Sequence, residues 1–237
     1  MKIELDDGFL FGKGAFETIK VVNGAPLFLK EHLNRLKSSL EFFGIDRKID
    51  TDEIYKYIED SDEKNFALKI IASDKNFIIT SRPDNYRDDY KSFRLKISDA
   101  RRNSSSKMIY HKNLCYYENI YEHRLAASFG YDNALFLNER GEVSECDFSN
   151  IFFVKGDMIY TPPLSSGLLR GTMREYLMEI FKIEERVIKR DEIKNFDECF
   201  ISNSLMGIRS VESIDDFEFK KFDEADKILK NLQKFGF

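Results

Sequence analysis

The dipeptide Asn23-Gly24 constrains the fold of this chain more than any other short stretch. Asparagine and glycine both tolerate the positive φ angles of a two-residue hairpin turn, and apolar residues stand on both sides of them. The run FLFGKGAFETIKVV at 9–22 predicts one strand, and PLFLK at 26–30 predicts its returning partner. The N-terminal part is therefore expected to fold around a β-hairpin.

Beyond Lys30 the apolar spacing changes from that of a strand to that of a helix. Apolar residues recur at intervals of three and four up to Phe43, and Gly44 ends the helix. A second helix is predicted over 51–60, with Thr51 or Asp52 as its cap. Further strands are predicted at 65–73, 76–82 and 93–98.

The remainder of the chain again mixes helices and strands. Helices are predicted at 113–129, 172–182 and 222–234, between strand-like runs such as ALFLN, SNIFFV, ERVIK and ECFISNS. The polar, serine-rich stretch DARRNSSSK at 99–107 is typical of a linker. We therefore predict an α+β protein with a small N-terminal domain over 1–100, an interdomain linker over 101–107 and a C-terminal domain over 108–237.

Composition excludes several classes of protein. A chain of 237 residues with 42% hydrophobic and 33% charged residues can build a core, and no apolar run approaches the roughly 20 residues of a membrane helix. A net charge of −5 argues against a nucleic-acid partner. The acidic start MKIELDDGF does not resemble a secretory signal, so we expect a cytoplasmic protein without a membrane partner.

Most familiar catalytic patterns are missing from the sequence. No Gly-x-Ser-x-Gly elbow occurs, and the histidines at 32, 111 and 123 are scattered. The three cysteines are widely spaced, so no metal site and no disulfide framework is predicted. The triplet Gly12-Lys13-Gly14 lacks the spacing of a phosphate-binding loop. Lysine chemistry remains.

The stretch at 111–154 offers a lysine and a glutamate for such chemistry. Lys112 stands just before an amphipathic helical run, and Glu145 follows a predicted strand and a Glu-Arg-Gly-Glu turn. A lysine amine attacks carbonyls when burial or a neighbouring charge weakens its hold on the proton. A pyridoxal phosphate centre also needs an acid for the ring nitrogen and an anion site. The turns SGLLRGTMRE at 166–175 and ISNSLMG at 201–207, with Arg35, are candidates for the anion site.

Six segments carry a family resemblance: FGKGAFETIKVVNG, EHLNRL, HKNLCYY, GEVSECDFSNIFFV, TPPLSSGLLRGTMRE and ISNSL. In order and approximate spacing they are similar to segments of the class IV aminotransferases, the fold-type IV pyridoxal phosphate enzymes. The resemblance implies a homodimer with pyridoxal 5'-phosphate in the cleft between two domains. It implies that Lys112 binds the cofactor covalently and that Glu145 pairs with the pyridine nitrogen. The other implied cofactor contacts are Arg35, Gly171, Thr172, Met173, Ser204, Tyr117 at the ring hydroxyl, and Asn150, which braces the glutamate strand.

The family contains aminotransferases and 4-amino-4-deoxychorismate lyases, which share the first proton removal by the lysine. The lyases then expel an enolpyruvyl group and leave p-aminobenzoate and pyruvate, a step of folate biosynthesis. The short chain, the linker RRNSSSKMIYHKN and the turn SNSLM resemble the lyases more than the other branches. An aminotransferase of the branched-chain or D-amino-acid type, using 2-oxoglutarate, is the alternative.

The lyase substrate carries two carboxylates, and the resemblance implies basic substrate contacts. The basic candidates are Lys69 and Lys20, and the neutral amide of Asn203 is a further candidate substrate contact. The turn ASDKNF at 72–77 is shorter than the corresponding lyase loop and lacks its arginine, so either Lys75 or Arg101 replaces that arginine or the substrate differs. A family-like scaffold that serves only as a binding module is the competing class, and retention of the lysine, the glutamate and the cofactor arginine argues against it.

Overall fold

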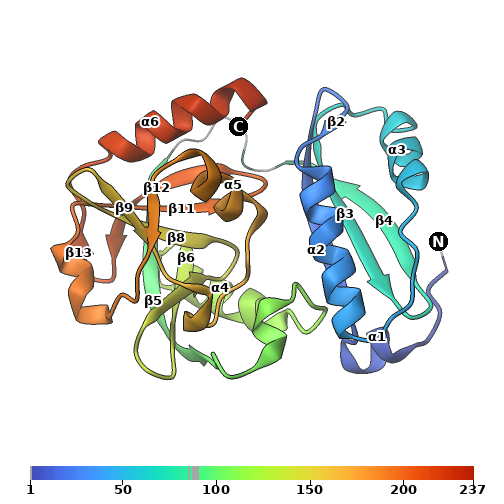
Figure 1. The fold of residues 1–237 in the computed structure, drawn as a ribbon, viewed down its shortest axis with the longest axis horizontal. Helices are drawn as coiled ribbons and strands as arrows, with labels where there is room; N and C mark the ends of the chain where they lie inside the picture. The colour runs from blue at the N-terminus through green and yellow to red at the C-terminus, as the bar shows by residue number, and fades with distance from the viewer. Residues whose placement is uncertain (1, 85, 87–90) are drawn as a thin grey trace. The chain divides into compact units, whose positions relative to one another are not determined.

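The computed structural model describes residues 2–84, 86 and 91–237. The chain divides into two compact units (Figure 1). Unit 1 comprises Met1–Arg87 and His111–Tyr116, and unit 2 comprises Asp88–Tyr110 and Tyr117–Phe237. The mixed architecture confirms the α+β class.

These limits differ from the predicted domain limits. The predicted linker 101–107 begins inside strand β5 (Phe93–Arg102), where Arg101 and Arg102 pair with strand β6 (Asn133–Asn138). The segment ends in a short 3-10 helix, η1 (Lys107–Tyr110), which also belongs to unit 2. The polar composition that predicted a linker thus includes strand residues whose backbone groups are satisfied by β6.

Unit 1 contains an antiparallel sheet within its described residues. Its strand order is β2 (Ala25–Pro26), β1 (Gly14–Val22), β3 (Phe66–Ser73) and β4 (Phe77–Arg82). The hairpin prediction is confirmed, because Asn23 and Gly24 both have positive φ angles, of 51° and 78°, between β1 and β2. This sheet is the frame on which the predicted lysine site is built.

Two helices pack with one face of this sheet. Helix α2 (Leu29–Phe42) contributes Leu36 and Leu40 to a core that also contains Ile19 and Leu68, and helix α3 (Thr51–Glu59) adds to the same core (Figure 1). Asp50 caps α3 by accepting from the Asp52 N–H at 3.0 Å, so the predicted caps, Thr51 and Asp52, are wrong by one or two residues. Strand alternation leaves the opposite face of the sheet to other residues.

The first predicted strand begins later than expected. Residues Asp7–Phe11 form helix α1, because Asp6 accepts a hydrogen bond from the Phe9 N–H at 3.1 Å and caps the helix. Gly12, with a φ of 73°, then reverses the chain into β1. The apolar run at 9–11 was mistaken for a strand because three residues carry no period.

Unit 2 contains a larger mixed sheet within its described residues. Its order is β10 (Ile183–Glu185), β9 (Met158–Thr161), β8 (Asn150–Lys155), β11 (Glu198–Asn203), β12 (Gly207–Ile214), β5, β6 and β7 (Val143–Cys146), with β13 (Phe217–Glu218) paired to β12. Parallel pairs join β12 to β5, β5 to β6 and β10 to β9. Strand β12 was not predicted.

Helices and short 3-10 turns complete unit 2. They are α4 (Tyr117–Ser128), η2 (Leu164–Ser166), α5 (Thr172–Ile180), η3 (Arg190–Asn195), α6 (Asp223–Leu232) and η4 (Gln233–Phe235). Helix α6 packs on β11 and β12 (Figure 1). Among the residues that the structure describes, no helix is long and apolar enough to cross a membrane.

Candidate active site

Lys112 lies on a short segment of unit 1 that is hydrogen-bonded to β1. The Phe16 N–H donates to the Lys112 carbonyl at 2.9 Å, and the Leu114 N–H donates to the Gly14 carbonyl at 3.1 Å. The half-buried amine lies 4.5 Å from the centroid of the Phe16 ring and 4.8 Å from that of Tyr116. Its Nζ is also 3.5 Å from the Tyr116 hydroxyl. Tyr116 was not among the candidate residues named from the sequence, and the structure adds this polar contact.

A buried charge cluster fixes Arg35 on the other face of β1. The Arg35 guanidinium donates to both carboxylate oxygens of Glu17, at 2.8 and 2.6 Å, and His32 Nδ1 lies 2.7 Å from Glu17 Oε2. Burial acts to raise the pKa of Glu17, but Arg35 and His32 together lower it to about 2. Burial lowers the pKa of His32, and the nearby charge of Lys112 adds to this effect. His32 is therefore neutral at pH 7 and donates from Nδ1.

The face of the unit 1 sheet away from α2 carries basic side chains. Strand register places Lys69 opposite Thr18 on β1 and Thr80 on β4, two register pairs from Arg82 and on the same face. The Lys69 Nζ lies 4.6 Å from the centroid of the Phe16 ring, which Lys112 also contacts. Burial lowers the pKa of Lys69, and the charge of Arg82 lowers it further. Sequence reasoning missed Arg82, although its position on the strand paired with Lys69 could have suggested it.

Lys20 points to the same face but has a different partner. Its Nζ lies 2.6 Å from Asp84 Oδ2, and the two side chains are only 7% and 2% exposed. A buried carboxylate at this distance already compensates the ammonium charge. This pairing weighs against the predicted substrate role of Lys20.

Glu145 lies on β7 in unit 2 and is 7% exposed. Its Oε2 accepts a hydrogen bond from the Leu169 N–H at 2.9 Å, and its Oε1 lies 3.4 Å from Nε of Arg102. Arg102 stacks over the Phe136 ring at 3.8 Å and was not singled out from the sequence as a contact of the glutamate. A carboxylate held from two sides keeps one orientation.

The turn before α5 is held against β8 by Asn150. The Asn150 amide donates to the Leu169 carbonyl at 2.9 Å, and a side chain at Gly171 would overlap the Asn150 Oδ1. Gly171 is the N-cap of α5, followed by the buried residues Thr172 and Met173. The backbone N–H groups of a first helical turn have no partner within the helix, so this end of α5 offers donors to an anion.

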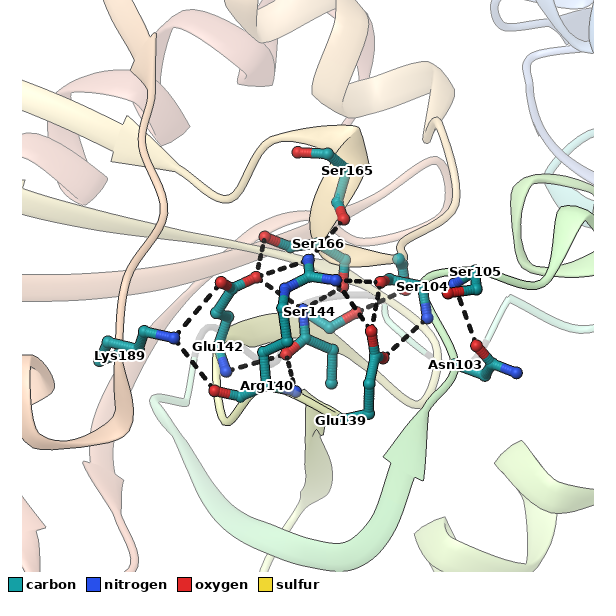
Figure 2. A network of polar contacts seen from close by, with 12 residues as sticks. Asn103, Ser104, Ser105, Glu139, Arg140, Glu142, Ser144, Ser165, Ser166 and Lys189 are labelled. Atoms are coloured by element: carbon teal, nitrogen blue, oxygen red, sulfur yellow. Dashed lines mark hydrogen bonds and ion pairs between the residues drawn. The ribbon is translucent and has the colours of Figure 1, made fainter.

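A polar network that includes residues of β6, β7 and the turn between them also holds the segment before α5 (Figure 2). Glu142 accepts from Asn138 and Arg140 at 2.8 Å each, and Arg140 also donates to the Ser165 carbonyl at 2.9 Å. Ser144 Oγ donates to the Gly167 carbonyl at 2.6 Å. The hydrogen bond from Arg140 first, and those from Asn138 and Lys189, outweigh burial and lower the pKa of Glu142 to about 2. The hairpin between β6 and β7 therefore anchors the turn that presents Leu169 to Glu145.

The third segment of the predicted site in unit 2 comprises the end of β11 and the turn after it. Ser202 pairs with Asn150 in the strand register, and its hydroxyl is buried without a hydrogen bond to any described residue. Asn203 donates to the Phe148 carbonyl at 3.2 Å and accepts from the N–H groups of Leu205 and Met206. This use of its amide holds the turn that exposes Ser204 and favours a structural role over the predicted substrate contact.

The predicted site residues thus fall into two groups. Lys112, Arg35, Lys69 and Lys20 belong to unit 1, and the other predicted contacts belong to unit 2. Within unit 2, Glu145, Asn150 and Gly171–Met173 lie together around the turn before α5. Tyr117 opens α4, and its side chain is 66% exposed.

A lysine against aromatic rings, a buried carboxylate and a helix N-terminus beside an unsatisfied hydroxyl are the parts of a pyridoxal phosphate enzyme. A family model described as "Amino-transferase class IV" matches residues 14–214. The chain therefore belongs to the class IV aminotransferase family, whose members are pyridoxal phosphate-dependent enzymes.

Named relatives fall into two activities. The chain is 30% identical over 229 residues to a "Probable branched-chain-amino-acid aminotransferase" of Rickettsia bellii, covering 86% of this chain and 79% of that protein. It is 26% identical over 258 residues to the "Aminodeoxychorismate lyase" of Bacillus subtilis, covering 97% and 87%. A solved structure from Legionella pneumophila, provisionally assigned as a 4-amino-4-deoxychorismate lyase, matches with a TM-score of 0.89 and 27% identity over 99% of this chain and 95% of that one.

The residues present fit the cofactor of the family. The hydroxyl of Ser202 is buried and lacks a hydrogen bond within the described part of the chain, so a polar ligand at the adjacent turn would satisfy it. The close approach of Gly171 to Asn150 leaves no space for a larger residue at the helix start. A phosphate group has the charge and the acceptors that this end of α5 lacks.

Proposed function

We propose that Lys112 is the lysine that binds pyridoxal phosphate and that Glu145 holds the proton on its ring nitrogen. Arg35, the N-terminus of α5 at Gly171–Met173 and the hydroxyls of Ser202 and Ser204 bind the phosphate. Glu17 keeps the Arg35 guanidinium in one orientation through two hydrogen bonds, at 2.8 and 2.6 Å. Tyr117 contacts the ring hydroxyl, as the resemblance implies.

The bound cofactor supplies an electron sink for the substrate carbon that bears nitrogen. The side chains of this protein do the remaining work. The Lys112 amine removes the proton from that carbon, and the rings of Phe16 and Tyr116 keep it in position. Neutral His32 adds no second positive charge near the amine, because burial lowers its pKa.

The specific reaction that we propose is that of a 4-amino-4-deoxychorismate lyase, which forms p-aminobenzoate and pyruvate for folate biosynthesis. The observation that supports it is the pair of basic side chains, Lys69 and Arg82, on one face of the unit 1 sheet, where Lys69 contacts the same Phe16 ring as Lys112. A substrate with two carboxylates has use for two cations beside the reacting amine. The resemblance to the Bacillus and Legionella proteins supports the same assignment.

An aminotransferase is the second candidate, favoured by the Rickettsia relatives, which are named branched-chain aminotransferases at 28–30% identity. Such an enzyme would need 2-oxoglutarate or another oxo acid as acceptor. The two candidates share Lys112 and Glu145, so no substitution of these residues separates them.

Product analysis separates the two reactions. The purified protein with pyridoxal phosphate and 4-amino-4-deoxychorismate is expected to release p-aminobenzoate and pyruvate in equal amounts without an oxo acid. Turnover of an amino acid only when 2-oxoglutarate is present, with formation of glutamate, would make the aminotransferase the correct assignment.

Truncating the basic face tests the substrate contacts. Lys69→Ala and Arg82→Ala are each expected to raise KM by about tenfold with a smaller change in kcat, because each cation binds ground state and transition state alike. Lys64→Ala, which removes an exposed lysine whose Nζ donates to the Ser61 carbonyl at 3.0 Å, is the matched control. A fall in kcat at unchanged KM would contradict this role.

The proposal includes a cytoplasmic homodimer, as the family resemblance implies. Sedimentation velocity at micromolar concentration is expected to give a mass of twice the 27.9 kDa chain. A single species at the chain mass would contradict it.

A further inference from the structure

Arg102 is a buried cation that touches two carboxylates in unit 2. Its side chain is 5% exposed, its Nη1 lies 2.8 Å from Oε2 of Glu118, and its Nε lies 3.4 Å from Oε1 of Glu145. The guanidinium stacks on the Phe136 ring, with 3.8 Å from its central carbon to the ring centroid. The arginine is therefore fixed by packing on β6 and cannot swing away from Glu145.

The contact between Arg102 and Glu145 is electrostatic and lacks a hydrogen bond. The Arg102 Nε is buried and forms no hydrogen bond to any described residue, although 3.4 Å is within ion-pair distance. Glu145 Oε2 is meanwhile oriented by the Leu169 N–H. Attraction between unit charges at such a distance is strong in a buried setting, even when no proton lies between the two atoms.

We propose that Arg102 is a positioning residue that sets how strongly Glu145 holds the proton of the cofactor's ring nitrogen, by sharing the negative charge of that carboxylate. The inference rests on the proposed pairing of Glu145 with the ring. A carboxylate beside a permanent cation is a weaker acceptor for a second cation, because part of its charge is already compensated. Arg102 thereby limits the interaction between Glu145 and the ring N–H.

Glu118, on α4, has the opposite effect on the charge of Glu145. It pairs with the outer side of the guanidinium and is 56% exposed, so solvent screens it more than Glu145. Removing Glu118 leaves the full charge of Arg102 to Glu145. The chain of charges Glu118, Arg102 and Glu145 therefore predicts opposite effects for neutralising its first and second members.

The residues that follow Glu145 in the sequence, Cys146 and Asp147, do not share the interaction with Arg102. Burial raises the pKa of the Cys146 thiol well above its ordinary value, so the thiol is neutral. Asp147 accepts hydrogen bonds from the N–H groups of Ala134 and Phe148 and from the amide of Asn133. Its carboxylate is thus compensated by groups other than Arg102.

The test compares the affinity of the protein for pyridoxal phosphate with its affinity for the analogue that has carbon in place of the ring nitrogen. Only the natural cofactor gains from Glu145, so the ratio of the two dissociation constants measures this interaction and cancels general effects on the fold. Titrations followed by absorbance give both constants for the wild type, Arg102→Met, Arg102→Lys and Glu118→Gln.

Arg102→Met is expected to raise the ratio of the two dissociation constants in favour of pyridoxal phosphate about tenfold, which corresponds to a change of about one pKa unit at the ring nitrogen. Glu118→Gln is expected to lower it by a smaller factor, and Arg102→Lys, which keeps the charge, to stay within about threefold of the wild type. In a Glu145→Gln background Arg102→Met should leave the ratio unchanged.

Equal ratios in all four proteins, or a shift of the same sign in Arg102→Met and Glu118→Gln, would overturn the inference. A purely structural role for Arg102 would weaken both ligands alike and leave the ratio constant. Failure of the proposed function is distinguishable, because a wild-type protein that binds neither ligand contradicts the cofactor assignment itself.

Discussion

Replacing Gly171 with alanine tests the close contact between Gly171 and Asn150 in the turn before α5. Gly171 has a φ of −72° and a ψ of 137°, which alanine adopts without strain, so the backbone itself accepts the change. The new Cβ overlaps Oδ1 of Asn150, whose amide donates to the Leu169 carbonyl at 2.9 Å. The Asn150 side chain must therefore move and give up that hydrogen bond.

The structure fixes the expected size of this effect. Losing one hydrogen bond and leaving a half-buried carbonyl without that partner costs about 1–3 kcal/mol. Replacing a glycine with alanine reduces the conformational freedom of the unfolded chain, which stabilises the folded protein by about 0.4–1 kcal/mol. We therefore expect Gly171→Ala to destabilise the protein by about 1–2 kcal/mol. It should also weaken pyridoxal phosphate binding, because the displaced Asn150 no longer holds the turn that leads into α5.

Urea unfolding of the cofactor-free protein and absorbance titration with pyridoxal phosphate measure the two quantities. Asn150→Ala provides the matched background, because it removes the atom that the new Cβ would strike. In that background Gly171→Ala is expected to be neutral or slightly stabilising. The same cost in both backgrounds would refute the steric argument, and with it the account of how Asn150 shapes the turn.

Two further predictions concern stability. Asp84→Asn leaves the buried Lys20 ammonium without its counter-charge and is expected to lower the free energy of unfolding by about 3 kcal/mol, whereas the double variant Lys20→Met with Asp84→Asn should cost less. Chemical denaturation of the wild type and both variants checks this, and equal losses in the two variants would contradict it. The hydrogen bond to Asp147 raises the pKa of His123, so its contribution is full below about pH 6.5 and is lost as the pH rises through the folded-state pKa. His123→Gln should therefore reduce the stability at pH 5.5 more than at pH 8.5, and a larger loss at the higher pH would contradict the assignment.

Much of unit 1 follows from local patterns in the sequence. The Asn23-Gly24 turn, the period of α2 and the apolar runs of β3 and β4 are all signals within ten to fifteen residues. Residues 9–11 were misassigned, because the cap formed by Asp6 outweighs the apolar character of the segment. Strand β12 was missed, although it forms a hairpin with β11; its other partner, β5, lies more than a hundred residues earlier in the chain.

The candidate site was predictable only in part. The motifs around Lys112, Glu145 and Gly171 resemble a known family, which is why they were found. Lys20 was proposed as a substrate contact from the family resemblance, and its place on a strand gives a face but cannot show the partner, Asp84, 64 residues later. Arg102 and the network around Glu142 were missed, because Arg102 contacts Glu118 16 positions later and Glu142 contacts Lys189 47 positions later in the sequence.

Borohydride reduction followed by peptide mass mapping tests the central claim most directly. The protein loaded with pyridoxal phosphate should be yellow, and reduction should fix the cofactor on the peptide that contains Lys112. Lys112→Ala should show neither the fixed cofactor nor activity. Cofactor attached to another lysine, or a colourless protein that takes up no pyridoxal phosphate, would contradict the account.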